Sequence, residues 1–285
     1  MHTSKTSVFA FSQAVIVVAL LAAVAPAAGG DAADCLIITE IVLGNESGEH
    51  PRWMEITNTG LEDYTFTEGG VIVQEDDSSD TTVDINLAQL DVTIQAGQAY
   101  VICSTADGGS GAFYAVYGQH ADLYVGDGIP FGDGNDRFIL TDTGDGSNLL
   151  DIYGEFGVNG TGEPWEYTLG YSYRLAAYNS GNDGVFVPEE WYFGGVDSLK
   201  GNGQPSWELM LMYTNPGRHA YDEDCIACPG DLDGDNDIDL ADLAQLLGNY
   251  GTTSGAEYTD GDIDLDGDVD LADLAALLGV YGTSC

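Results

Sequence analysis

The feature that most constrains this chain is a duplicated stretch close to its C-terminal end. Residues 231–253 and 262–284 align at an offset of 31 positions and are identical at 16 of 23. Each copy opens with an aspartate at every second position and continues into a leucine-rich segment. Because acidic and apolar residues keep the same register in both copies, we expect each copy to form one loop followed by one helix.

The alternating aspartates have the spacing of a calcium-binding loop. Calcium takes roughly six to eight oxygen ligands, which a twelve-residue loop supplies from its first, third, fifth, seventh, ninth and twelfth positions. The predicted ligands of the two ions are Asp231, Asp233, Asp235, Asp237, Asp239 and Asp242 in one loop, and Asp262, Asp264, Asp266, Asp268, Asp270 and Asp273 in the other. At the seventh position we expect the backbone carbonyl to bind, and at the ninth a bridging water.

Two other loop positions agree with this interpretation. The sixth position needs a left-handed backbone, which Gly267 adopts freely and Asn236 tolerates. Ile238 and Val269 occupy the eighth position, where an apolar side chain is expected to reach the core. The alternative is a solvated acidic run, but spacing, turn residue and apolar position agree in both copies, which favours calcium.

Each loop leads into a short apolar helix. The residues at helical spacing are Leu240, Leu243, Leu247 and Tyr250 in the first copy, and Leu271, Leu274, Leu278 and Tyr281 in the second. Helices this short do not persist alone in water, so we expect the two apolar faces to pack on each other. Residues 229–285 hold 14 acidic residues and no basic one, so metal binding and folding are expected to be one event.

Neither loop has a helix before it, and this duplicated half-motif in residues 229–285 resembles the type I dockerin domain. That family binds cohesin domains on extracellular scaffolds, and Asp at the twelfth position follows its pattern. The resemblance implies that Leu240, Ala241, Leu271 and Ala272 contact the partner, in two orientations related by a half-turn. Dockerins usually carry Ser or Thr there and a basic residue further along, so a cohesin-like or other scaffold protein of different specificity is expected.

The larger part of the chain, up to residue 213, has the pattern of a β-protein. Short β-rich runs are separated by Gly, Asn and Asp turns, and they span residues 36–42, 53–57, 71–74, 100–103, 137–141 and 149–153. Only residues 112–117 suggest a helix. Strands at this spacing predict an antiparallel sandwich.

Several of these segments resemble the lamin tail domain, an immunoglobulin-like sandwich. The matching motifs are Leu-Ile-Ile-Thr-Glu-Ile at 36–41, Trp-Met-Glu-Ile-Thr-Asn-Thr-Gly at 53–60, the Gly-then-hydrophobic strand at 96–102, and Tyr-Ser-Tyr-Arg at 171–174 with Trp191 and Asn-Pro-Gly at 215–217. The expected fold is therefore mainly β: an immunoglobulin-like antiparallel β-sandwich at 31–217, a linker at 218–228 and the small helical domain at 229–285.

The first 30 residues are expected to be a signal peptide, with a weakly basic start, an apolar run at 14–25 and the cleavage motif Ala25-Pro26-Ala27. That run is too short to span a membrane. The chain carries 48 acidic against 6 basic residues, and such a surface repels nucleic acid and anionic membranes. We expect a secreted or cell-surface protein that inserts into no membrane.

Five cysteines in an exported chain are read first as disulfides. A bridge between Cys228 and Cys285 would join the ends of the small domain. Cys35, Cys103 and Cys225 remain, and one of the five must stay unpaired or bond another chain. Structural bridging is favoured over zinc or redox chemistry at Cys225-x-x-Cys228, because no second cysteine pair or nearby histidine accompanies it.

No catalytic motif is evident in the large domain. His50, His120 and His219 each sit alone in turn-like sequence, which predicts surface or capping roles. Glu55 is the most notable carboxylate, with a structural role at a sheet edge favoured. Two aromatic groups, Trp165, Tyr167, Tyr171 and Tyr173 or Trp191, Tyr192 and Phe193, are expected to be mostly core, with a glycan platform as the alternative.

Together these features predict a non-catalytic calcium-binding protein whose dockerin-like module attaches a β-sandwich outside the cell. The alternative is a secreted carbohydrate-active protein, either a polysaccharide hydrolase or a carbohydrate-binding module, delivered by its dockerin.

Overall fold

A computed structural model of the chain describes residues 33–44, 51–104, 109–126, 132–201, 203–221, 225, 229–235 and 237–283. The expected signal peptide, His50, Asn236, and both members of the predicted Cys228–Cys285 bridge lie outside the described residues. Within those residues, no helix combines the length and the apolar character that crossing a membrane requires.

The larger part of the described chain is organised around β-sheets, as expected. The larger sheet has the order β12-β11-β1-β2-β7-β8. Its strands are β1 (Leu36–Leu43), β2 (Arg52–Asn58), β7 (Ala99–Ser104), β8 (Leu123–Val125), β11 (Tyr171–Arg174) and β12 (Trp191–Phe193). The smaller sheet, of order β10-β9-β4-β5, contains β4 (Gly70–Gln74), β5 (Ile85–Asn86), β9 (Arg137–Thr141) and β10 (Leu149–Tyr153). The pair β3 (Tyr64–Thr65) and β6 (Thr93–Ile94), and one-turn helices at Ala88–Leu90 and Pro188–Glu190, complete this part.

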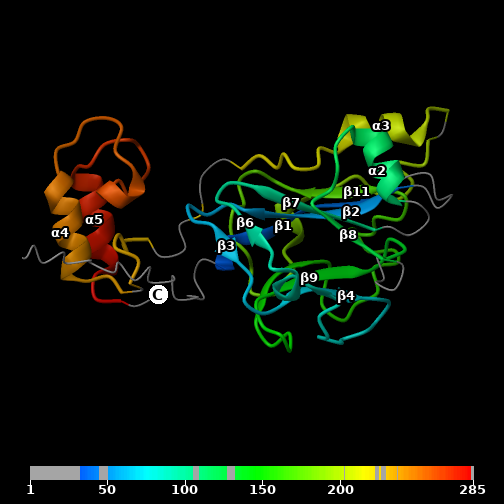
Figure 1. Cartoon of the computed structure of the whole chain (residues 1–285), viewed down its shortest axis with the longest axis horizontal. Coiled ribbons are helices and arrows are strands. Elements are labelled where there is room, and N and C mark those ends of the chain that lie inside the picture. Colours follow the sequence, from blue (N-terminus) through cyan, green and yellow to red (C-terminus); the bar gives the residue numbers. More distant parts are fainter. Residues whose placement is uncertain are drawn as a thin grey trace, which may run out of the picture.

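The two sheets enclose the main apolar core. Leu36 and Met54 from the larger sheet pack with Val71 and Leu140 from the smaller one. All eight residues of β1 are buried, because β1 is a central strand whose outer face is covered as well. Figure 1 shows the helices α2 (Gly109–Tyr117) and α3 (Ser206–Tyr213) on that outer face, opposite β9 and β4. The six predicted strands and the short predicted helix are all present, with bounds that differ by at most a few residues.

Two features of this part differ from the expectation. β8 pairs with β7 in parallel, although we expected antiparallel strands throughout. The cause is α2, which lies between the two strands in sequence and carries the chain across the sheet, as a parallel connection requires. The helix α3 was not predicted, because its sequence Ser-Trp-Glu-Leu-Met-Leu-Met-Tyr has apolar residues on every side. Burial of Met210 against the sheet decides its structure.

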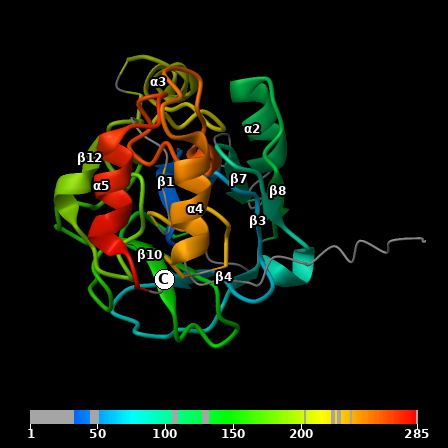
Figure 2. The same cartoon turned by 90° about the vertical axis from the view of Figure 1, so that its left-hand side faces the viewer.

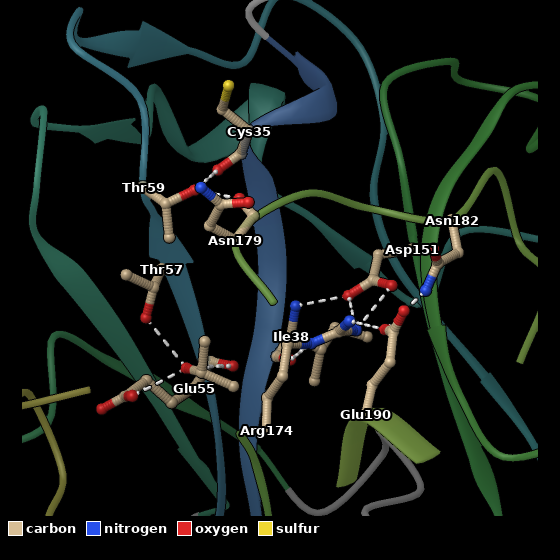
Figure 3. Close-up of polar contacts among 11 residues, drawn as sticks. Cys35, Ile38, Glu55, Thr57, Thr59, Asp151, Arg174, Asn179, Asn182 and Glu190 are labelled. Atoms are coloured by element: carbon tan, nitrogen blue, oxygen red, sulfur yellow. Dashed lines mark hydrogen bonds and ion pairs between the residues drawn. The ribbon is translucent and has the colours of Figure 1, made fainter. Parts of the chain in front are cut away.

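A buried ionic network joins the sheets. Arg174 of β11 forms ion pairs with Asp151 of β10 and with Glu190 (Figure 3). Asp151 also accepts the amide of Ile38 at 2.7 Å, and Arg174 Nε donates to the Ile38 carbonyl at 3.0 Å. These bonds satisfy the backbone of β1 where its register with β2 shifts, between Ile38 and Glu40. The network therefore fixes an irregular point of the central strand.

One disulfide joins Cys35, at the start of β1, to Cys225. The amide of Cys225 donates to the Thr59 carbonyl at 2.8 Å, so the residue is held against the sandwich by backbone as well as sulfur. Cys103 carries a buried thiol, whose pKa burial raises to about 12. The sequence left the pairing of these three cysteines open, because it does not reveal that residues 190 positions apart meet.

The C-terminal unit contains the two expected helices, α4 (Leu240–Asn249) and α5 (Leu271–Val280), and a 3-10 turn at Tyr258–Asp260. The helices lie side by side in both views (Figures 1 and 2). Their apolar core consists of Leu232, Ile238, Leu246, Ile263, Val269 and Leu277, with Leu243 and Leu274 partly buried against it. Thus the eighth-position residues of the two loops reach the core as predicted.

The expected packing face of each helix was wrong in most of its residues. Leu247 and Leu278 are exposed, as are Tyr250 and Tyr281, whereas Leu246 and Leu277 are fully buried. The sequence offers leucines at both of two adjacent positions, so helical periodicity alone does not decide which one turns inward. As a result, each helix leaves an apolar surface outside.

Candidate calcium sites

Each loop brings its carboxylates together in two groups that share the twelfth-position aspartate. In the first loop, ligand-type oxygens of Asp231, Asp233 and Asp242 lie within 4.8 Å of one another, and so do those of Asp237, Asp239 and Asp242. The second loop repeats both groups, as Asp262, Asp264 and Asp273, and as Asp268, Asp270 and Asp273. Ten of the twelve predicted ligands are therefore gathered around two centres.

The twelfth-position aspartate closes each loop. Asp242 is fully buried; its Oδ1 accepts the amide of Leu232 at 2.7 Å, and its Oδ2 accepts the amide of Asp239 at 2.7 Å. Asp273 accepts from the corresponding amides of Ile263 and Asp270 at the same distances. One side chain thus ties the loop's beginning to the start of its helix, with the same hydrogen bonds in both copies.

The ninth-position aspartates begin the helices. Asp239 Oδ1 accepts the amide of Ala241 at 2.6 Å, which caps α4. Asp270 caps α5 by the same bond to Ala272 at 2.6 Å. The first amides of a helix have no partner within the helix, and a capping side chain supplies one. Two aspartates of the carboxylate groups therefore also fix where each helix starts.

The fifth-position aspartates are the two predicted ligands outside these groups. Asp235 Oδ1 accepts the amide of Asp237 at 3.2 Å, and Asp266 Oδ1 accepts that of Asp268 at 3.1 Å. Asp231 supports the same turn from the first position, where its Oδ1 accepts the amide of Gly234 at 2.8 Å. These bonds shape the loop backbone around the carboxylate groups.

The seventh-position side chains lie where we expected only a backbone carbonyl. Oδ1 of Asp237 and Oδ1 of Asp268 are buried, and neither has a hydrogen-bond partner within the described part of the chain. Both side chains belong to the carboxylate groups. Buried polar atoms normally have a hydrogen-bond partner. An unpartnered oxygen at the same place in both loops therefore indicates a ligand to which the carboxylate oxygen donates an electron pair. A hard cation fits that need.

The electrostatics of the loops point the same way. Partial desolvation and the neighbouring carboxylates raise the pKa of Asp233 and of Asp237. The pKa values of Asp264 and Asp268 are raised for the same reasons. No basic residue occurs in residues 229–285 to relieve this repulsion. Oxygen donors alone, crowded and negatively charged, are the ligand set that calcium prefers over zinc or copper.

The loop backbone confirms one prediction and adds a feature that the sequence did not reveal. Gly267, at the sixth position, has a φ of +89°, as expected. The fourth position is left-handed as well, with φ +77° at Gly234 and +58° at Leu265. A leucine in this region is strained, because its Cβ approaches the following carbonyl. Loop two therefore holds strain that loop one avoids.

The two repeats are also cross-connected by backbone hydrogen bonds. Ile238 of the first loop exchanges bonds with Gly282 and Thr283, which follow α5. In turn, Val269 of the second loop exchanges bonds with Gly251 and Thr252, which follow α4. Each loop is thus tied to the end of the other helix, so the two candidate sites form one structural unit.

The predicted partner-binding residues lie together with these sites at the helix starts. Leu240 is 66% exposed and Leu271 is 67% exposed. Ala241 and Ala272 are exposed as well. Their equal exposure follows from the repeat, since each pair occupies the same place on its own helix.

The other described candidates from the sequence, a carboxylate, two histidines and several aromatic residues, lie in or against the large domain. Glu55 is fully buried in β2, an internal strand, so the expected sheet-edge position is wrong; its Oε2 accepts the amide of Gly217, in a turn. His120 is exposed, as predicted, beside Tyr124. His219 is partly buried instead and lines a pocket. Of the aromatic candidates, Trp165, Tyr167, Tyr171 and Trp191 are core residues, whereas Tyr192 is exposed.

Comparisons with protein-family models, with curated proteins and with solved structures found no match to this chain.

Proposed function

We propose that this protein is a secreted, non-catalytic docking protein whose C-terminal unit binds two calcium ions and attaches a β-sandwich to an extracellular scaffold protein. The proposal depends on one observation above all. The same carboxylate groups, with the same closing hydrogen bonds and the same unpartnered seventh-position oxygen, occur twice at an offset of 31 residues. A solvated acidic run has no reason to show the same carboxylate groups and closing hydrogen bonds in both copies.

In each loop, the side chains that would hold the ion are those of the aspartates at loop positions one, three, seven, nine and twelve. A bound ion supplies positive charge among carboxylates that otherwise repel one another. Because Asp242 and Asp273 connect loop to helix, neutralising the loops favours the closed arrangement in which Leu246 and Leu277 are buried. Calcium binding should therefore stabilise the whole C-terminal unit.

Isothermal titration calorimetry of the full chain with Ca²⁺ tests this step. Two ions are expected per chain, and one ion in each of the variants Asp233→Asn and Asp264→Asn. Both aspartates are exposed, and the substitution removes charge without changing shape. The matched control is Glu62→Gln, at an exposed position of the sandwich, which should still bind two ions. Binding of two ions by the double variant Asp233→Asn/Asp264→Asn would contradict the assignment.

Attachment is the second part of the proposal. The exposed pairs Leu240–Ala241 and Leu271–Ala272 begin the two helices, beside further apolar surface at Leu247 and Leu278. An apolar surface repeated by internal symmetry suits a single partner that binds in either of two orientations, as in the dockerins that this unit resembles. The partner we propose is a cohesin-like domain of a scaffold protein outside the cell.

A binding assay against a panel of purified cohesin domains, with calcium and with EGTA, tests attachment. Ala241→Arg and Ala272→Arg should each leave one binding orientation and hence binding. The double variant should lose binding while it still takes up two calcium ions. The double variant Gln89→Arg/Gln95→Arg, at two exposed positions of the sandwich, is the charge-matched control. Full binding by the double variant Ala241→Arg/Ala272→Arg, or binding that is insensitive to EGTA, would refute the docking proposal.

The proposal also includes secretion of the protein and the fold family of its large domain. A disulfide between Cys35 and Cys225 suits an oxidising environment. Residues 31–217 are proposed to be an immunoglobulin-like, lamin-tail-like sandwich, on the basis of two packed sheets and the motifs at β1, β2 and β11.

A further inference from the structure

A pocket of about 420 Å³ lies on the outer side of the larger sheet, beside the end of α3. Glu40 of β1 and Tyr173 of β11 line it from the sheet, and Tyr213 lines it from α3. The segment after α3 contributes His219. The pocket thus joins residues from three distant parts of the sequence, and none of them belongs to the candidate calcium sites.

Two buried polar atoms at this pocket lack a partner in the part of the chain that the structure describes. Glu40 is only 2% exposed; its Oε2 accepts the amide of Asn215 at 3.3 Å, but its Oε1 accepts no hydrogen bond. Nε2 of His219 is equally without a partner. Because buried polar atoms are nearly always paired, two such atoms lining one pocket indicate that a ligand supplies the missing hydrogen bonds.

The charges around the pocket define what kind of ligand fits. Burial, and then the neighbouring Glu55, raise the pKa of Glu40 well above its ordinary value. Burial and the nearby Arg174 lower the pKa of His219 to about 4. His219 is therefore uncharged near neutral pH, and the raised pKa of Glu40 favours its neutral form. The Arg174 guanidinium is already paired with Asp151 and Glu190. A neutral group that both donates and accepts, such as a hydroxyl, matches these two atoms.

A strip of tyrosines extends from the pocket across β11, β12 and α3. Tyr173 stacks on Tyr192 with ring centroids 4.8 Å apart and planes inclined by 18°. Tyr171 stacks on Tyr213 at 5.6 Å and 9°. Tyr192 is 44% exposed and Tyr213 is 45% exposed, so the strip presents aromatic surface to solvent. Flat rings with polar tips suit ligands that combine apolar C–H faces with hydroxyl groups.

We propose that the sandwich binds a neutral carbohydrate, with hydroxyl groups hydrogen-bonded to Glu40 Oε1 and His219 Nε2 and sugar rings packed against Tyr213 and Tyr192. This proposal does not depend on the calcium sites. Binding rather than hydrolysis is inferred, because glycoside hydrolysis uses two carboxyl groups at the sugar. Among the described residues that line the pocket, Glu40 carries the one carboxyl group, whereas the oxygens of the neighbouring Glu55 accept from Thr39 and Gly217.

The signal for this pocket in the sequence was weak. Glu40 is the one acidic residue in the strand Leu-Ile-Ile-Thr-Glu-Ile-Val-Leu, whose other residues are apolar except Thr39, and this marks it as a buried acid. His219 has no such signal, because its burial depends on the segment after α3 folding back over β1 and β11.

Titration calorimetry of the full chain with neutral oligosaccharides of β-1,4-linked glucose, xylose and mannose tests the proposal. Oligogalacturonate and deacetylated chito-oligosaccharide serve as anionic and cationic comparisons. At least one neutral oligosaccharide is expected to bind, and to bind equally in EGTA. His219→Ala and Tyr213→Ala should each weaken binding by about tenfold, through a lost hydrogen bond or a lost stacking surface.

The matched control is Tyr114→Ala on α2, which removes a tyrosine that is 52% exposed but lies outside the pocket. Its affinity should stay that of the unchanged protein, and thermal unfolding should identify any variant that does not fold. Three results would each overturn the proposal: no binding of any neutral oligosaccharide, tighter binding of the anionic or cationic one, or full affinity in folded His219→Ala and Tyr213→Ala.

Discussion

Replacing Glu55 by glutamine should change how the stability of the sandwich depends on pH. Glu55 is completely buried, opposite Glu40 on the neighbouring strand. Burial is the main cause that raises its pKa from 4.5 to about 7, against the hydrogen bonds from Thr39 and Gly217, which lower it. The folded protein therefore holds a proton on Glu55 at pH values where the unfolded chain has released it.

The sign follows from this difference in bound protons. A carboxyl whose folded pKa is raised stabilises most at pH values below its unfolded pKa, and that contribution is lost as the pH rises through the folded pKa. For values of 4.5 and about 7, the loss between pH 5 and pH 8 amounts to about 2–3 kcal/mol in the free energy of unfolding. His219 has the opposite sign, because its folded pKa is lowered, so the curve of the unchanged protein mixes both effects.

The difference between the unchanged protein and Glu55→Gln isolates the glutamate. Urea unfolding followed by tryptophan emission is the assay, with calcium held constant. It reports on the sandwich alone, since the four tryptophans are Trp53, Trp165, Trp191 and Trp207, all before the C-terminal unit. The stability advantage of Glu55 over glutamine should shrink by about 2–3 kcal/mol from pH 5 to pH 8. An advantage that stays constant from pH 5 to pH 8 would refute the buried protonated carboxyl.

Three further outcomes are expected. Leu265→Gly should strengthen calcium binding at loop two by about two- to fivefold, because removing left-handed strain outweighs the added chain entropy, and Gly234→Leu should weaken loop one in calorimetry. Cys35→Ser with Cys225→Ser should lower sandwich stability by up to about 5 kcal/mol in urea unfolding, since the bridge closes a loop of 190 residues; an unchanged midpoint would count against it. Asp151→Asn should cost about 3–5 kcal/mol in the same assay, because it removes one of the two carboxylates that pair with the buried Arg174, and a cost under about 1 kcal/mol would contradict this role.

The six longest strands of the sandwich could be predicted because their residues carry a local signal. β1, β2 and β9 are β-rich runs between turn residues, and no distant contact is needed to recognise them. The helix α3 and the parallel strand β8 lack such a signal. Their structure depends on packing against the outer face of the larger sheet, which residues within a short window do not reveal.

The candidate calcium loops show the same division on a smaller scale. Of the twelve aspartates that spacing alone predicted, ten gather, because a twelve-residue loop has few ways to bring its side chains together. The left-handed backbone at Leu265 was not predicted, since leucine gives no reason to expect it. Nor was the outward orientation of Leu247, because Leu246 beside it is equally apolar and only the packing of two helices selects between them.

By itself, the sequence determined the β-rich character of the large domain, the two loop–helix repeats, and the aspartates that each repeat gathers. These features are local, and periodicity and turn chemistry encode them. Only the tertiary structure decided that Cys35 meets Cys225, that Arg174 joins the sheets, and that Glu40 and His219 line one pocket. Such contacts join residues far apart in the chain, and their burial and protonation depend on which surfaces fold together.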